Sequence, residues 1–146
     1  MNKNFAMRCT TLSVVIVFTL LISSVFVYAL SSSWGFTMGY DGCYLNGSKN
    51  NVYHSLAKGG VSISGTIRNT YSQPGATGPN QLTFVLMNKT SGNSFGKVTV
   101  TPVANGFKTF AGTFSSVGGG TTYYLVIYRA NPDGRTLVGS GTLKNL

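Results

Sequence analysis

Hydrophobic and polar residues alternate along most of the chain that follows the first thirty residues, with the period of two that is typical of β-strands. In residues 60–68, Val61, Ile63 and Ile67 would face one way, while serine, threonine and arginine occupy positions that face the other. Residues 96–102 repeat this pattern with two valines. No segment in this part of the chain has the three-to-four-residue apolar spacing of an amphipathic helix. The pattern therefore predicts an all-β protein.

Two segments, Leu82 to Met87 and Tyr123 to Tyr128, carry apolar or aromatic residues on both faces. Such strands are usually covered by protein on both sides, so we predict that both are central. Residues 50–60 fit either a short helical turn or an alternating strand, and we interpret them as strand or irregular structure. Further strands are predicted at residues 35–40, 107–115 and 136–143.

Short segments rich in glycine, proline, asparagine and serine separate these strands, and such segments form turns. They lie at residues 46–51, 72–80, 90–94, 117–120 and 131–134. Seven or eight short strands joined by such turns predict a single antiparallel β-sandwich that is jelly-roll-like. Three of the predicted strands contain similar short motifs, which are SISGTI, FAGTF and VGSGTL. No fixed period relates these motifs, so we expect no repeat architecture.

The first 29 residues have the layout of a cleavable signal peptide. Lys3 and Arg8 precede an apolar run from Leu12 to Ala29, and the run ends in a Val-Tyr-Ala cleavage site. An uncleaved membrane anchor is the alternative, because the run is nearly long enough to span a bilayer. We expect cleavage, which intact-mass measurement of exported protein would test. The product, residues 30–146, would be a secreted bacterial domain without stable membrane insertion, able to associate with the cell wall.

The net positive charge of the chain indicates which kinds of macromolecule it attracts. The 146 residues include 11 lysines and arginines, two aspartates and no glutamate, which gives a formal net charge of +9. Loss of Lys3 and Arg8 would leave nine basic residues against two aspartates, or +7. Such a surplus attracts polyanions, and outside a bacterium we expect these to be wall polymers and anionic lipid headgroups rather than nucleic acid. We expect no nucleic-acid partner, because the basic residues are spread along the chain without a basic stripe or a reading helix.

Cysteine content limits covalent stabilisation. Cleavage would remove Cys9 and leave Cys43 as the only cysteine, so no intramolecular disulfide could form. We expect a monomer. A dimer linked through Cys43 remains the alternative.

Residues for catalysis are scarce in the predicted mature chain. Its two carboxylates, Asp41 and Asp133, both lie next to glycines in turn-like sequences, which nearly excludes a glycosidase. No G-x-S-x-G elbow surrounds any serine, so a thiol pair of Cys43 with His54 is the remaining enzymatic alternative. We expect His54 to be a solvent-facing or hydrogen-bonded strand residue. The sequence predicts that the protein is not an enzyme and holds no metal or cofactor.

Aromatic residues are concentrated in residues 34–53, and we predict a binding surface formed by Trp34, Tyr40, Tyr44 and Tyr53. Rings with polar tips are typical of sugar-stacking and protein-contact surfaces. The alternative is that Trp34 and its neighbour Phe36 fill the end of the core. We therefore predict a binding module for cell-surface polymers, glycans or another protein. A secreted antimicrobial, bacteriocin-like antagonist is the alternative, although no amphipathic cationic helix is present to disrupt membranes.

Overall fold

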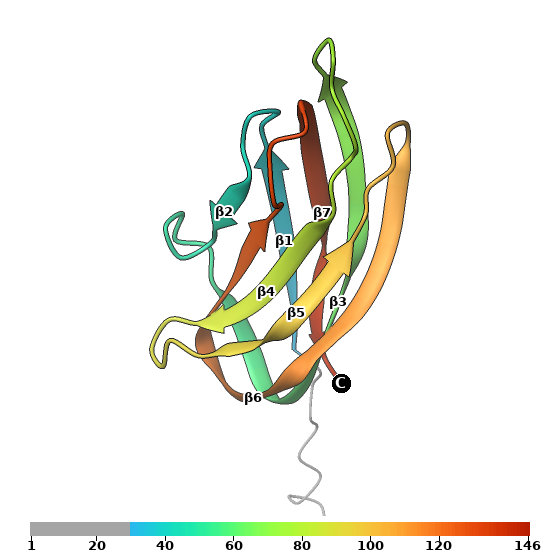
Figure 1. Ribbon diagram of the computed structural model, residues 1–146. Helices are drawn as coiled ribbons and strands as arrows, with labels where there is room; N and C mark the ends of the chain where they lie inside the picture. Colours follow the sequence, from blue (N-terminus) through green and yellow to red (C-terminus); the bar gives the residue numbers. More distant parts are fainter. Residues whose placement is uncertain (1–29) are drawn as a thin grey trace, which may run out of the picture.

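A computed structural model describes residues 30–146, which are built from strands and connecting loops (Figure 1). The predicted signal peptide lies outside the described residues. Residues 30–146 contain no helix long and apolar enough to cross a membrane. The strands are β1 (Ser31–Met38), β2 (Tyr44–Asn46), β3 (His54–Ser72), β4 (Leu82–Asn88), β5 (Ser94–Val100), β6 (Phe107–Tyr128) and β7 (Arg135–Asn145).

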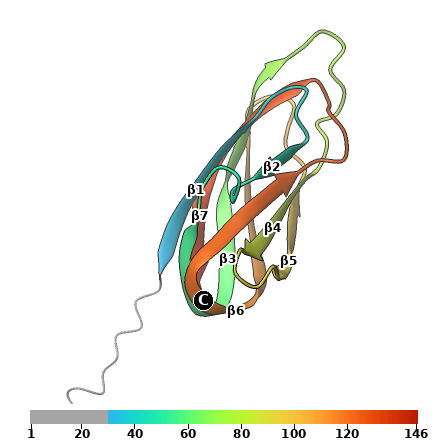
Figure 2. The ribbon, with the colours of Figure 1, turned by 90° about the vertical axis from the view of Figure 1, so that its left-hand side faces the viewer.

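The strands form one antiparallel sheet in the order β1-β7-β3-β6-β4-β5, and β2 pairs with β6 beside this path. The sheet folds over on itself into two layers, which Figure 2 shows from the side. Side chains of both layers meet between them, as where the Trp34 ring on β1 lies 5.4 Å from the Phe84 ring on β4. The predicted antiparallel β-sandwich is therefore confirmed.

The two segments that were expected to be central are interior strands. β4 lies between β5 and β6, and the second half of β6 lies between β4 on one side and β2 with the start of β3 on the other. Tyr123, Leu125 and Ile127 of β6 point into the core and are nearly inaccessible to solvent. Both predictions of a central position are therefore correct.

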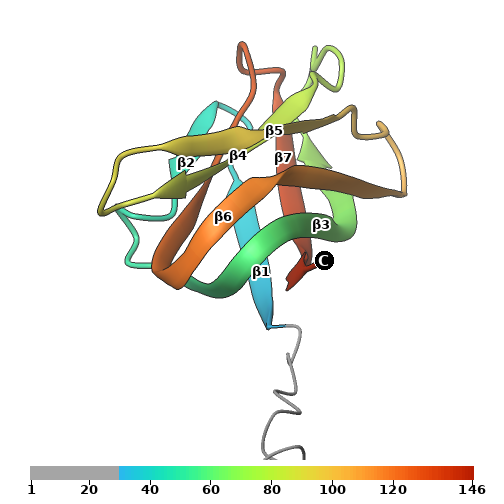
Figure 3. The same ribbon diagram turned by 90° about the horizontal axis from the view of Figure 1, so that it is seen from below.

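The long strands β3 and β6 belong to both layers and curve together around one end of the sandwich (Figure 3). β6 pairs with β3 up to Tyr123 and with β4 from Tyr123 to Tyr128. The bend contains Gly119 and Gly120, whose φ angles of +85° and +133° strongly favour glycine. The prediction of a turn at residues 117–120 is wrong, because these residues continue one strand, which bends at the glycines and shifts its register against β3 on either side of the bend.

Trp34 belongs to the core, and its ring also lies 5.8 Å from the Phe110 ring. Two glycines that face each other across β3 and β7, Gly65 and Gly141, leave room for the indole. A Cβ atom would lie 2.4 Å from Trp34 Cζ2 at Gly65 and 2.7 Å from it at Gly141. One glycine in each of the motifs SISGTI and VGSGTL therefore makes room for the same large side chain. This shared packing role explains why the two motifs are similar without a sequence repeat.

One buried ion pair joins the loops at the end of the sandwich away from the β3–β6 bend. Arg129 and Asp133 are each 2% exposed and bond to each other through Nη1 and Oδ1. Arg129 also donates to the carbonyl oxygens of Gly42 at 2.7 Å and Gly39 at 2.8 Å, while Asp133 accepts from the Asn80 N–H at 2.8 Å. Asp133 thus has a structural role, as expected, but Arg129 is not one of the exposed charges.

Candidate functional site

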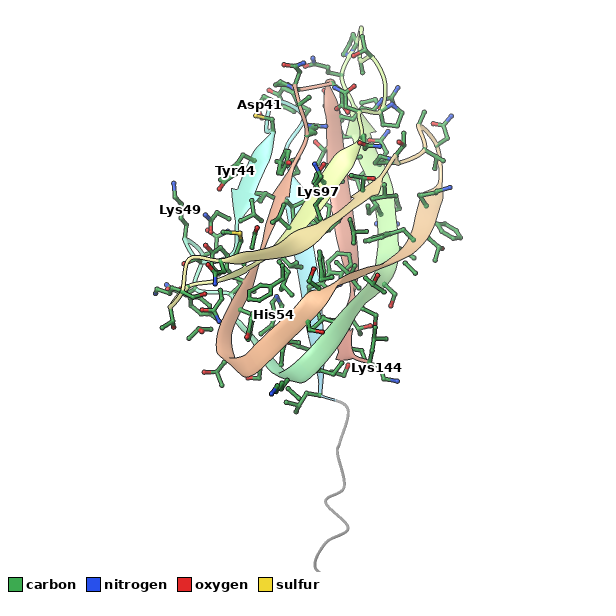
Figure 4. The ribbon with its side chains drawn as sticks, turned by 60° about the horizontal axis from the view of Figure 1, so that its bottom comes forward. Asp41, Tyr44, Lys49, His54, Lys97 and Lys144 are labelled. Atoms are coloured by element: carbon green, nitrogen blue, oxygen red, sulfur yellow. The ribbon has the colours of Figure 1, made fainter. Side chains whose placement is uncertain are left out.

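The four aromatic residues predicted to form a binding surface lie in three different places. Tyr44 and Tyr53 lie on the outer face of the layer that contains β2, β4, β5 and the second half of β6, and Figure 4 shows Tyr44 pointing away from the body of the protein. Trp34 is 5% exposed within the core and offers no ring to a ligand on this face. Tyr40 follows β1, with its ring 5.9 Å from that of Tyr71. The structure therefore brings together Tyr44 and Tyr53 alone.

Two further tyrosines, Tyr124 and Tyr128, complete this surface, and we call the four residues the tyrosine face. Tyr44 pairs directly with Tyr128 across β2 and β6. Tyr124 lies four residues before Tyr128 in the same strand, so both side chains are on the same side of the sheet. The Tyr53 ring lies 6.3 Å from the Tyr124 ring at an interplanar angle of 86°. Three separate segments thus supply rings to one outer face.

Tyr53 is held by polar contacts at one corner of the tyrosine face. Its hydroxyl lies 3.0 Å from Ser48 Oγ, and Lys89 Nζ lies 5.0 Å from the centre of its ring. The side chain of Lys89, and then that of Ser48, lowers the pKa of the Tyr53 hydroxyl, because hydrogen-bond donors favour the phenolate form. This corner therefore combines an oriented ring with a cation.

The surface between the rings mixes apolar and polar side chains. In the register of the sheet, Asn46, Val126, Val85 and Lys97 follow one another across β2, β6, β4 and β5. Asn46 Nδ2 donates to the Tyr44 hydroxyl at 3.3 Å. An amide on one side and an ammonium group on the other thus flank a strip of partly exposed valines.

Tyr124 and Tyr128 were not predicted as site residues, because the apolar residues on both faces of residues 123–128 indicated a strand that is covered on both sides. The outward face of this strand is only partly covered, since its alternate residues Tyr124, Val126 and Tyr128 are half-buried. Tyrosine itself was the available signal, because its hydroxyl favours positions at the margin of a core over positions inside it.

A small cleft opens at the side of the sandwich, between β1 and the loop that joins β2 to β3. Its volume is about 110 Å³, and most of its walls are apolar, including Phe36, Leu45 and Val52. Trp34 forms part of the wall, and its Nε1 is buried without a hydrogen-bond partner among residues 30–146. His54 also lines this cleft.

His54 is 2% exposed, so the solvent-facing interpretation is wrong and the hydrogen-bonded one is correct. Ser32 Oγ lies 2.9 Å from Nδ1 of its ring. Burial lowers the pKa of His54, because desolvation disfavours the charged imidazolium. Within residues 30–146, no group of three histidine, cysteine or acidic side chains could hold a metal ion.

Catalysis by His54 would need a third group that orients its ring, as in a nucleophile–base–acid triad. The ring's one side-chain hydrogen bond in the described part of the chain is to Ser32, and none joins it to Cys43 or to an aspartate. Cys43 is a free, half-buried cysteine. The absence of enzymatic activity and of a metal or cofactor stays a prediction.

No protein-family model and no curated protein matches the chain. Similar solved structures include a carbohydrate-binding module from Cellvibrio mixtus lichenase 5A in complex with cellotriose, which is 12% identical over 80% of this chain and 95% of that chain, with a TM-score of 0.46. A family 29 carbohydrate-binding module is 12% identical over 78% and 79% of the two chains, with a TM-score of 0.43. The Yersinia pseudotuberculosis-derived mitogen is 10% identical over 82% and 88%, with a TM-score of 0.42. Because these TM-scores are below 0.5, no functional conclusion follows from the likenesses.

Proposed function

We propose that this protein is a non-catalytic module that binds a glycan on its tyrosine face. The observation that carries the proposal is the convergence of four tyrosine rings from three segments on one outer face of the sandwich. The core does not need these rings, and Tyr44 is 53% exposed. Exposed aromatic surface with a polar margin is typical of an interaction site.

Sugars match the chemistry of this face. A sugar ring has an apolar C–H face and a rim of hydroxyl groups, while tyrosine combines a π face with a hydrogen-bonding tip. Asn46 and Lys97 flank the rings with further hydrogen-bond donors. Small ligands usually bind in concave pockets, whereas an open sheet face suits an extended polymer. A chain of sugar units is therefore the ligand class that we favour over a small molecule.

The predicted export and the positive charge favour a polymer of the cell wall or cell surface. Of the nine basic residues in residues 30–146, Arg129 alone is buried, so the other eight contribute to the field at the surface. That field raises the local concentration of a polyanion near the protein, while the tyrosine face would supply the short-range contacts.

Isothermal titration calorimetry with soluble glycans, together with co-sedimentation with isolated cell walls, tests this function. We expect Tyr44→Ala and Tyr128→Ala each to weaken glycan binding by about fivefold or more, as truncation of an interface hot spot does. Tyr71→Ala is the matched control, because Tyr71 is 51% exposed but lies against Tyr40 away from the tyrosine face.

Equal losses in all three variants, or no loss in any, would contradict the assignment of the site. Tight binding to a protein with no binding to glycans would instead make the tyrosine face a protein contact. Growth inhibition of other microbes without wall binding would favour the antimicrobial alternative.

A further inference from the structure

A hollow of about 290 Å³ lies on the outer face of the other layer. Three neighbouring strands form it, in the order β7, β3 and β6, and Figure 1 shows them side by side at the back of the sandwich. The hollow combines an aromatic ring, a guanidinium group and two hydroxyl groups. Its lining residues are Thr66, Arg68, Phe107, Val138, Gly139 and Ser140.

The register of the sheet places these groups in two adjacent rows. Arg68 lies directly between Val138 on β7 and Phe107 on β6. Two residues earlier on β3, Thr66 pairs with Ser140. Phe107 is 69% exposed, so its ring contributes little to the core and remains open to a ligand.

Arg68 has no counter-ion within the part of the chain that the structure describes. Among residues 30–146, Arg129 and Asp133 form the one ion pair between side chains, and no hydrogen bond involves the side chain of Arg68. The sequence contains a single other carboxylate side chain, Asp41, which is exposed in the loop after β1. The Arg68 guanidinium therefore has its five donors available for an external anion.

We propose that this hollow is a second binding site, which takes a sugar unit carrying a negatively charged group. The planar fork of Arg68 matches a carboxylate in two parallel hydrogen bonds. Phe107 offers its face to the sugar ring, and Thr66 and Ser140 offer hydroxyl groups that no other described side chain uses. The site stands independently of the tyrosine face. Two sites on opposite outer faces would let one molecule bridge two polymer chains and gain avidity.

Titration calorimetry of the whole protein with three probes tests this site: a hexuronic acid tetrasaccharide, a neutral hexose tetrasaccharide of the same linkage, and inorganic phosphate. We expect Arg68→Gln to weaken hexuronate binding about tenfold, as loss of a charge-assisted hydrogen bond does, and to leave neutral-glycan binding unchanged. Lys108→Gln is the control, because it removes the same charge from an exposed neighbour on β6 that does not line the hollow. Phe107→Ala should weaken hexuronate binding without changing the response to phosphate.

The other outcomes separate this site from a general charge effect and from the tyrosine face. One such outcome is that Arg68→Gln and Lys108→Gln lower hexuronate affinity equally, with a loss that disappears at high salt. That result would attribute the binding to the net positive charge of the protein and would overturn the proposal. Phosphate binding as tight as hexuronate binding would show that the site recognises an anion without a sugar ring, and it would overturn the assignment of a sugar unit as the ligand. Hexuronate binding that depends on Tyr128 and not on Arg68 would also overturn it. Hexuronate binding through Arg68 without neutral-glycan binding would instead refute the proposed function of the tyrosine face and leave this site in place.

Discussion

Gly65→Ala is the substitution that most directly tests how the core is assembled. The added Cβ would lie 2.4 Å from Trp34 Cζ2 and 2.4 Å from the backbone oxygen of Ser140. Carbon atoms in favourable contact are about 3.5–4.0 Å apart, so the overlap with the indole carbon exceeds 1 Å. The Phe84 and Phe110 rings pack against the indole, with ring centres 5.4 and 5.8 Å from its own, and they restrict its movement.

Overpacking of a close-packed core costs about 1–3 kcal/mol. We expect the upper part of this range at Gly65, because one of the two contacts is with backbone that cannot rotate away. A loss of about 2–3 kcal/mol would lower Tm by about 6–15 °C in a domain of this size. Differential scanning calorimetry, and urea unfolding monitored by near-ultraviolet circular dichroism, would measure it.

Gly118→Ala is the matched control in β6. A Cβ atom at Gly118 would have no neighbour within 4 Å, and its φ does not lie in the left-handed region. We expect no loss there, or a gain of up to about 1 kcal/mol from lower entropy of the unfolded chain. If both alanine variants melted at the same temperature, Trp34 could not lie over Gly65. The register that joins β1, β7 and β3 would then be wrong.

Two further predictions concern buried titratable groups. Because the pKa of His54 is lowered in the folded state, the unfolded chain binds its proton first, so stability should fall as pH decreases below about 6.5. Chemical denaturation from pH 7 to 5 should show this fall, and His54→Gln should flatten the profile. A profile unchanged by His54→Gln would mean that the histidine is not buried. Asp133→Asn should cost about 3–5 kcal/mol, because it leaves the Arg129 charge buried and unpaired, whereas Asp41→Asn at an exposed position should cost less than about 0.5 kcal/mol. Equal thermal midpoints for these two variants would refute the role of the ion pair.

The strand pattern was readable from the sequence because alternation is a local property. A period of two in residues 60–68 follows from the geometry of one extended segment, and it remains the same whichever strand becomes its neighbour. Continuous apolar runs likewise indicated that β4 and the end of β6 would be interior. The small number of acidic residues, histidines and cysteines is also a property of the sequence alone, and it leaves only a few residues that could take part in catalysis.

Only the tertiary structure decides which residues from distant segments lie next to each other. Tyr53 and Tyr124 are far apart in the sequence, yet their rings lie 6.3 Å apart because β3 and β6 bend together and bring their segments to one face. The same holds for Trp34: its sequence neighbours predicted a surface residue, but its ring is buried over Gly65 and Gly141 from two other strands. Local sequence determined which segments become strands and which side chains share a face. Pairing between segments far apart in the chain decided which faces meet, and therefore which aromatic rings are buried and which remain available to a ligand.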